Sequence, residues 1–218
     1  MTQLRLKSRP SGLDGSADVF RSTTRPVVYS QAEHARFSAS IAAAWQPELI
    51  PLAFDSFVRG VALHDRGYGE LDNDPIGEVE ETRWLEIMRR GFEPQDEDPV
   101  VDLVVALHIR RLVGGRTNDF DAAMPALIEA AGVSKANAMA ADAVTDVCDR
   151  ISFAFCLEEE DSGSVGSFAF DVAADGTATL APWPLMVPDF VTTVIGYQAA
   201  GYPFELDAVD RRFELRPA

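Results

Sequence analysis

Val61-Ala-Leu-His64-Asp65-Arg-Gly67-Tyr-Gly69 is the stretch on which the organisation of this chain depends. An apolar run with helical spacing ends in an adjacent histidine and aspartate, and two glycines follow. Imidazole nitrogen and carboxylate oxygen together suit Zn, Mn, Fe or Ni, and two neighbouring ligands at a helix end can reach one ion. The plainer alternative is a buried histidine bonded to a backbone carbonyl, with Asp65 facing water. The dipeptide alone carries too little information to choose between them.

The two other histidines of the chain also lie near the ends of apolar segments. His34 shares the inward face of a predicted helix with apolar residues at i+3, i+7 and i+11, and this helix begins after the capping residue Ser30. His108 shares the inward face of a second predicted helix, which Asp98-Pro99 starts. We therefore expect all three histidines to point into the core.

Helical periodicity dominates most of the chain, and a period of two follows it near the C-terminus. Asp175-Gly176 predicts a hairpin turn between two short strands. We expect a mainly α fold, a helical bundle with a small C-terminal antiparallel β annex (α+β overall). The expected parts are an N-terminal arm with short strands over 1–29, a helical core over 30–160 and the annex, packed on the core, over 161–218. Predicted helices span 30–45, 52–65, 79–90, 100–112, 120–131 and 134–158, and predicted strands span 4–6, 26–29, 168–172, 177–180 and 190–197, with one more short element after Tyr202.

Composition excludes several classes of protein. The net charge of −16 repels nucleic-acid phosphates and anionic lipid surfaces. No apolar run approaches the ~20 residues of a membrane span, and no secretory signal is visible, so we expect a cytoplasmic protein without nucleic-acid or membrane partners. Cys148 and Cys156 lie eight residues apart in one predicted helix, about 12 Å along its axis, which is too far for a disulfide. They are predicted to be core thiols.

The order of the candidate ligands is informative. His34, then His64-Asp65, then Asp149 followed by Arg150-Ile resembles the HD-domain superfamily of metal-dependent phosphohydrolases, which have an all-helical core. The sequence resembles more closely an uncharacterised bacterial family of unknown function with an HD-like core and a short β tail. The resemblance covers about residues 26–190 and rests on Gln31-x-x-His34, Leu63-His64-Asp65-x-Gly67-Tyr68, Leu71-Asp72-x-x-Pro75, Leu107-His108, Asp149-Arg150-Ile-Ser152 and Pro182-Trp183-Pro184.

The resemblance implies a divalent metal ion, Mn, Fe, Ni or Zn, held by His34, His64, Asp65 and Asp149. Asp146 replaces Asp149 if the register of its helix differs. His108 lies where members of the superfamily have an extra ligand or a group that contacts substrate, and we favour the substrate contact. The chain departs from the closer family at Tyr68, where tryptophan is usual, and at Arg66, where an acidic residue is common. Neither departure removes a ligand.

Such a site supports metal-assisted hydrolysis, in which Asp65 or Asp72 accepts a proton and His108 assists. Arginines at 66, 110, 111 and 150 each follow a candidate ligand closely. We expect Arg66, Arg111 and Arg150 to bind a small anionic, phosphorylated or nucleotide-like substrate.

Two other functions stay open. HD-like cores also host di-iron oxygenases, for which His108 and Asp72 would complete a second metal position. A non-catalytic metal- or ligand-binding module would instead use Trp183, between two prolines, as an exposed contact. Metal analysis separates the three, since two irons indicate the oxygenase and one Mn, Ni or Zn the hydrolase. The sequence leaves the oligomeric state open, and a homodimer is compatible with it.

Overall fold

The computed structural model describes residues 25–69, 80–114 and 119–218. The strand predicted at 4–6 and the candidate residue Asp72 lie outside these ranges. In the described part the chain forms, in order, β1 (Val27–Val28), α1 (Gln31–Ala43), the short 3₁₀ turn η1 (Pro47–Leu49), α2 (Phe54–Ala62), a second 3₁₀ turn η2 (Arg66–Tyr68), α3 (Glu81–Phe92), α4 (Pro99–Val113), α5 (Asp119–Ala130), α6 (Lys135–Leu157), β2 (Asp161–Val165), β3 (Phe168–Val172), β4 (Thr177–Ala181), β5 (Phe190–Gln198) and β6 (Ala208–Pro217).

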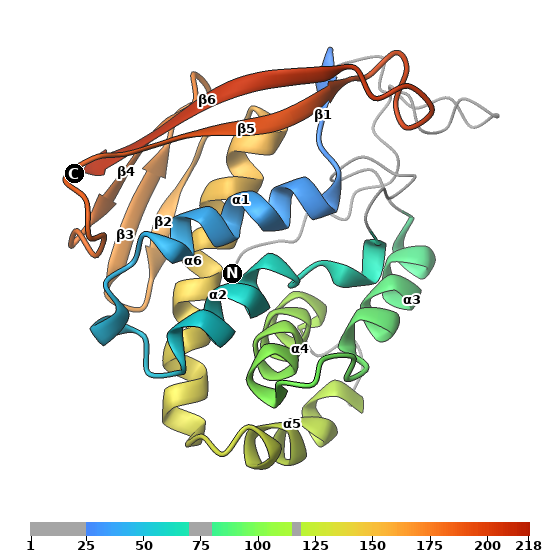
Figure 1. Cartoon of the computed structure of the whole chain (residues 1–218), viewed down its shortest axis with the longest axis vertical. Coiled ribbons are helices and arrows are strands. Elements are labelled where there is room, and N and C mark those ends of the chain that lie inside the picture. Colours follow the sequence, from blue (N-terminus) through green and yellow to red (C-terminus); the bar gives the residue numbers. More distant parts are fainter. Residues whose placement is uncertain (1–24, 70–79, 115–118) are drawn as a thin grey trace.

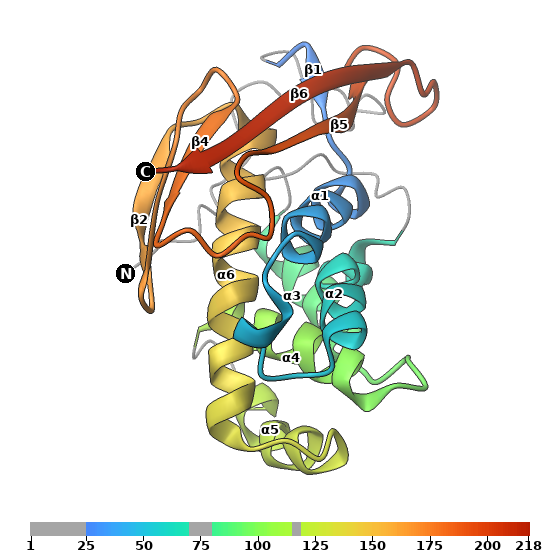
Figure 2. The ribbon, with the colours of Figure 1, turned by 60° about the vertical axis from the view of Figure 1, so that its left-hand side comes forward.

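Three layers make up the fold (Figures 1 and 2). The sheet curls over α1 and the long helix α6, with β2 and β3 against α6 and β5 against α1. On the other side of these two helices lie α2 and α4, and α4 also packs against α3 and α5. The helices α1, α2, α4 and α6 therefore pack around one region in the middle of the molecule.

The sheet corrects the expected fold class. A mainly helical bundle with a small antiparallel annex is wrong, because the described chain forms six strands in the mixed order β1-β5-β6-β4-β3-β2. The tail expected to form one short element is the ten-residue strand β6, which pairs antiparallel with β5 and parallel with β4. The N-terminal strand β1 joins the same sheet by pairing with β5. The sheet is therefore a full layer of the fold.

Aromatic side chains hold the sheet to the helices. Phe37 of α1, Phe155 of α6 and Phe213 of β6 are buried, and their ring centroids lie 4.8–5.3 Å apart in edge-on contacts. Such contacts add about 0.5–1.5 kcal/mol per pair beyond the burial of the rings. Because each ring comes from a different element, this cluster fixes α1 and α6 relative to each other, and both helices carry candidate ligands.

The capping residues predicted from sequence are confirmed. Ser30 Oγ accepts a hydrogen bond from the Glu33 amide at the start of α1, and Asp98 accepts one from the Val100 amide at the start of α4. Ser134 caps α6 in the same way. Cys148 and Cys156 are free and buried, as expected. Among the described residues, no helix has both the length and the apolar character that crossing a membrane requires.

The end of α2 differs from the prediction, which continued this helix to Asp65. The helix stops at Ala62, and His64 and Asp65 lie in the turn before η2. Gly60 lets α2 pack closely on α4, since a Cβ there would lie 2.6 Å from the Val104 Cβ. The turn itself packs on α3 through Gly67, where a Cβ would lie 2.3 Å from the Ile87 carbonyl oxygen. Tertiary contacts therefore determine where this helix ends.

Candidate metal centre

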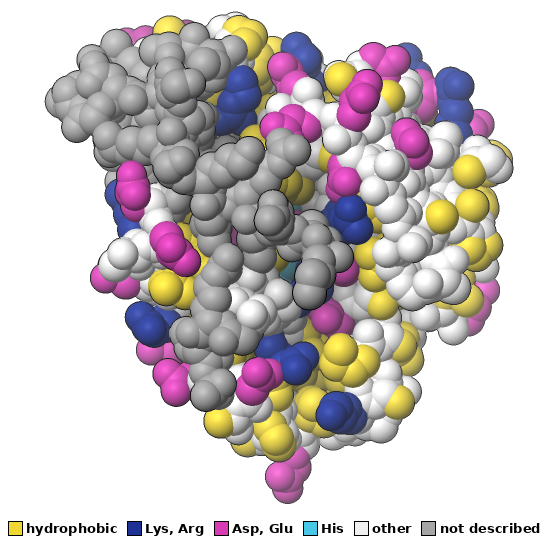
Figure 3. All heavy atoms as spheres, turned by 180° about the vertical axis from the view of Figure 1, so that it is seen from behind, with side chains coloured by type: hydrophobic (Ala, Val, Ile, Leu, Met, Phe, Trp, Pro, Cys, Tyr) yellow, Lys and Arg dark blue, Asp and Glu magenta, His cyan; other side chains and the backbone are white. Residues whose placement is uncertain are grey.

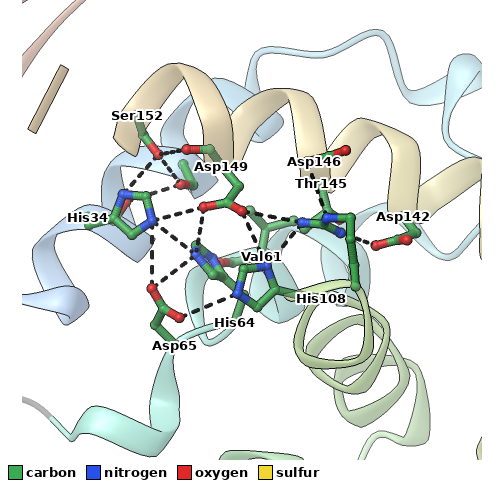
Figure 4. A network of polar contacts seen from close by, with 12 residues as sticks. His34, Val61, His64, Asp65, His108, Asp142, Thr145, Asp146, Asp149 and Ser152 are labelled. Atoms are coloured by element: carbon green, nitrogen blue, oxygen red, sulfur yellow. Dashed lines mark hydrogen bonds and ion pairs between the residues drawn. The ribbon is translucent and has the colours of Figure 1, made fainter. Parts of the chain in front are cut away.

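Five side chains from four segments meet in the space between the helices (Figure 4). α1 contributes His34, the turn after α2 contributes His64 and Asp65, α4 contributes His108, and α6 contributes Asp149. All five are buried. Buried ionisable groups are costly unless they are paired or bind a metal, so this cluster requires an explanation.

The backbone at the end of α2 positions His64. Its Nδ1 lies 2.6 Å from the Val61 carbonyl oxygen at the end of the helix. Since a carbonyl only accepts, His64 Nδ1 carries a proton and Nε2 faces the cluster, with a lone pair when the ring is neutral. The buried histidine bonded to a backbone carbonyl, the plainer of the two sequence interpretations, is thus present, and the same bond turns the ring towards the other ligands.

His34 is oriented in the same way by a hydroxyl group. Its Nδ1 lies 3.0 Å from Ser152 Oγ, and Ser152 Oγ also lies 3.0 Å from the Asp149 carbonyl and 2.5 Å from Ser38 Oγ. With the Ser152 hydrogen directed to the carbonyl, its oxygen can accept from His34 Nδ1. In that tautomer His34 Nε2 offers a lone pair, and it lies 3.2 Å from His64 Nε2.

Two carboxylate oxygens complete this arrangement. Asp149 Oδ1 lies 3.1 Å from His34 Nε2 and 3.6 Å from His64 Nε2. Asp65 Oδ2 lies 3.6 Å and 3.3 Å from the same two nitrogens. Four ligand atoms at tetrahedral positions about 2.0–2.2 Å from an ion would be about 3.3–3.6 Å apart, close to these separations. His34, His64 and Asp149 thus offer closely spaced ligand atoms for one divalent cation, and Asp65 lies with His64 and His108 in a second group that shares His64.

The cluster strongly favours positive charge. Burial opposes protonation of His64, but Asp65 and Asp149 outweigh it and raise the pKa of this histidine to about 10. Burial alone would raise the pKa of the two carboxyls, yet the surrounding histidines hold the pKa of both well below the usual range. A proton on His64 therefore takes the place of a cation in the metal-free chain.

His108 stands beside the four ligand atoms. Its Nε2 lies 3.4 Å from Asp65 Oδ1, the oxygen turned away from His34 and His64, and it has no hydrogen-bond partner within the described ranges. Its Nδ1 lies 3.1 Å from Arg111 Nη2 and 3.4 Å from Asp149 Oδ2. Burial and the neighbouring His64 lower the pKa of His108, so its ring is neutral.

Arg111 connects His108 to the acidic face of α6. Its guanidinium contacts Asp142 and Asp149, and its Nε lies 3.2 Å from Asp146 Oδ1. Asp146, the alternative ligand considered from sequence, is thus an arginine partner on the next turn of the helix. Burial raises the pKa of Asp146. The spacing of the three aspartates at i, i+4 and i+7 was visible in the sequence, but their common partner was not.

The two other arginines predicted to bind substrate lie away from the ligand atoms. Arg66 donates to Asp102 and to the carbonyls of Gly91 and Glu93. Arg150 pairs with Asp161 of β2 and lies over the Phe170 ring, between α6 and the sheet. Of the three arginines, Arg111 is the one that the structure brings to the cluster.

Two further predictions from the sequence concern Asp72 and Trp183. Asp72, predicted to accept a proton, lies outside the described ranges. Trp183 packs partly buried against the main core, and its indole nitrogen donates to the Val187 carbonyl. The hydroxyl groups of Ser38 and Ser152 orient His34, a role that we did not predict, although Ser152 belongs to the Asp149-Arg150-Ile-Ser152 motif.

The cluster lies beneath the face opposite that of Figure 1. Histidine atoms are visible there beside Lys or Arg side chains (Figure 3), and all three histidines of the chain belong to the cluster. The side chain of Arg111 is 20% exposed and that of Asp149 is 11% exposed. Of the side chains in and around the cluster, Arg111 and Asp149 are thus partly exposed on the side of α4 and α6.

Comparison with known proteins identifies a matching family, but it does not assign an activity. A family model described as "Protein of unknown function (DUF3891)" matches residues 19–199. No curated protein and no solved structure matches the chain significantly.

Proposed function

The chain belongs to this family of proteins of unknown function, DUF3891, so we infer its activity from the site itself and propose a metal-dependent hydrolase. The proposed substrate is a small phosphorylated or nucleotide-like compound. The proposed ligands are His34, His64, Asp65 and Asp149, and the proposed ion is Mn, Fe, Ni or Zn.

One observation carries the proposal. The Nε2 atoms of His34 and His64 face each other at 3.2 Å, while both Nδ1 atoms are engaged by oxygen. When both rings are neutral, two lone pairs face each other at this distance among two carboxylate oxygens, and in the metal-free chain a proton on His64 relieves their repulsion. A cation placed among the four atoms removes this repulsion and compensates both buried negative charges.

The order of the ligands supports hydrolysis as the reaction. A histidine on one helix, a His-Asp pair after the next and an aspartate on a late helix resemble the HD-domain superfamily of phosphohydrolases. A cation bound by such residues supplies Lewis acidity, which lowers the pKa of water towards about 7 and polarises a phosphoryl oxygen. The helical layer of this fold is compatible with the resemblance, although the six-stranded sheet was not expected from it.

The residues of the chain have distinct tasks in this proposal. Asp65 uses Oδ2 as a ligand and leaves Oδ1 near His108 Nε2 to accept a proton from water. His108 lies at the edge of the ligand set and contacts the substrate. The buried surroundings strengthen these electrostatic contacts, because water screens them poorly.

Metal titration and a phosphoester assay test the proposal. The metal-free protein should bind one equivalent of Zn²⁺ or Mn²⁺ and then hydrolyse bis(p-nitrophenyl) phosphate or a member of a nucleotide panel. His108→Gln should retain one ion and reduce kcat by about 10²–10⁴, the range of lost acid–base assistance. Arg110→Met is the control, because Arg110 pairs with the exposed Asp121.

Other results would assign the site differently. Two irons per chain with visible absorbance would replace the hydrolase with an HD-type oxygenase. One tightly bound ion without turnover of any phosphoester tested would indicate a non-catalytic metal-binding module. A chain that binds no divalent metal would contradict the proposed ligand set itself.

A further inference from the structure

His108 differs from the other two histidines in the partner of its Nδ1 atom. In His64 this atom faces a carbonyl and in His34 a hydroxyl oxygen, and both partners can accept. In His108 the partner is Arg111 Nη2 at 3.1 Å. A guanidinium only donates and stays charged at all ordinary pH values. His108 Nδ1 must therefore accept, which leaves the ring proton on Nε2.

The acidic face of α6 determines where Arg111 points. Asp142, Asp146 and Asp149 recur at i, i+4 and i+7 on this helix, and each contacts the guanidinium (Figure 4). Asp142 is 7% exposed, so much of this contact is shielded from water. A planar guanidinium held by three carboxylates has little freedom to turn away from His108.

The ring proton of His108 points towards the ligand atoms. Nε2 is buried, has no hydrogen-bond partner within the described ranges, and lies 3.4 Å from Asp65 Oδ1. A buried N–H that faces a carboxylate oxygen at this distance without good hydrogen-bond geometry is poorly satisfied, whereas an acceptor brought by a ligand would satisfy it. A nitrogen that carries a proton cannot coordinate a metal.

We propose that Arg111 is a positioning residue that fixes His108 as a neutral Nε2–H donor and keeps it out of the metal-ligand set. His64, Asp65 and His108 lie close enough together to resemble a second metal-binding triad. With its proton on Nε2, His108 cannot complete a metal site with His64 and Asp65. Its Nε2–H instead donates to an oxygen of the substrate. The tautomer follows from the contacts of His108 and Arg111, and its role in catalysis rests on the proposed hydrolase function.

Nitrogen NMR of the imidazole rings tests the proposal directly. The chain has three histidines, so ¹⁵N-histidine labelling gives three rings to assign. In the zinc-loaded protein, long-range proton–nitrogen correlations should show His108 with its proton on Nε2. His34 and His64 should show the proton on Nδ1 and zinc on Nε2. A proton on Nδ1 of His108, or zinc on its Nε2, would overturn the proposal.

Variants of Arg111 show whether this residue causes the tautomer. Arg111→Met should move a large fraction of the His108 proton to Nδ1, where Asp149 Oδ2 at 3.4 Å can accept it. Arg111→Lys retains a donor and should keep the proton on Nε2. Arg110→Met is the matched control on the same helix and should change nothing. A wild-type tautomer in folded Arg111→Met would contradict the assigned role.

Two further measurements separate this inference from the proposed function. Arg111→Met should lower kcat for bis(p-nitrophenyl) phosphate about 10–100-fold with KM unchanged, as expected for a residue that orients a catalytic group. A wild-type protein that binds no zinc would contradict the hydrolase, but the tautomer can still be measured in the metal-free chain. If Arg111→Met does not fold, the wild-type spectrum and Asp142→Asn, which loosens Arg111, still decide the question.

Discussion

Two buried polar networks lie on opposite sides of one short turn. Arg66 and the residues around Asp102 form one network, and His34, His64, Asp65 and Asp149 form the other. In the Arg66 network every contact joins a donor to an acceptor. Arg66 donates to Asp102 and to two carbonyls, and Asp102 also accepts from the amides of Gln95 and Asp96. In the histidine network, two imidazole Nε2 atoms and two carboxylate oxygens face one another.

This difference separates a structural network from a binding site. The Arg66 network contains one positive and one negative charge, and it ties η2 to the loop between α3 and α4. The histidine network brings two carboxylates and two imidazole Nε2 atoms together, and the positive charge beside them comes from a proton on His64 and from Arg111, which contacts Asp149. A network whose donors and acceptors are all paired stabilises the fold by itself, whereas ligand atoms that converge around an added proton can hold a cation in its place.

Removing one residue from each network would show the largest contrast. Asp65→Ala should lose the bound zinc ion, because the remaining ligands hold only one negative charge. Zinc raises the melting temperature of a protein that binds it only in the folded state, and this increase should also disappear. Metal analysis after dialysis and melting curves with and without zinc measure both effects. Retention of one equivalent of zinc in Asp65→Ala would show that Asp65 is not a required ligand and would contradict the proposed difference between the two networks.

Arg66→Met is the control from the other network. Removing one partner of a buried ion pair costs about 3–5 kcal/mol, so this variant should be clearly less stable. It should nevertheless bind one zinc ion with unchanged stoichiometry, since Arg66 contacts none of the four ligand atoms. Loss of zinc from folded Arg66→Met would mean that the turn cannot position His64 and Asp65 without its arginine.

A smaller effect is expected for the hydroxyl group behind His34. Ser152→Ala removes the acceptor of His34 Nδ1 but leaves all four ligand atoms in place. Loss of such an orienting contact weakens metal binding about 10–100-fold. Competition with a chromophoric chelator measures the affinity. Ser40→Ala removes a hydroxyl from the same helix as His34 without touching the cluster, and its zinc affinity should equal that of the wild type.

The last comparison concerns the pH dependence of the metal-free protein. Folding raises the pKa of His64 to about 10, so its contribution to stability is complete below the unfolded pKa of about 6.5 and is lost as pH rises towards 10. The free energy of unfolding should fall by at most about 1.4 kcal/mol per pH unit from about pH 6.5 to 8.5. Above that range the buried thiols of Cys148 and Cys156, whose pKa is also raised, add to the slope.

Urea denaturation at several pH values measures this slope. His64→Gln should lack it, and saturating zinc should reduce it because the ion replaces the proton. Zinc affinity should rise over the same pH range for the same reason. An equal slope in wild type and His64→Gln would show that other groups cause the pH dependence.

The prediction of the fold class failed because strand pairing is non-local. β6 contains alternating residues, with Phe213 and Leu215 facing the core, but many of its outward residues are charged. Nothing in that local pattern indicates a parallel partner in β4 or an antiparallel one in β5. The helices depend on local periodicity and capping, so their positions could be predicted more closely.

The sequence by itself determined which residues could form the site. Helical spacing placed His34 and His108 on inward faces, and the His-Asp pair at a helix end supplied two adjacent candidate metal ligands. Only the tertiary structure decided how each charged group is used. Arg66, Arg111 and Arg150 each follow a candidate ligand in sequence, yet they point respectively to a loop, to His108 and to the sheet. The orientation of a long side chain depends on partners brought near it by packing, and local spacing carries no information about those partners.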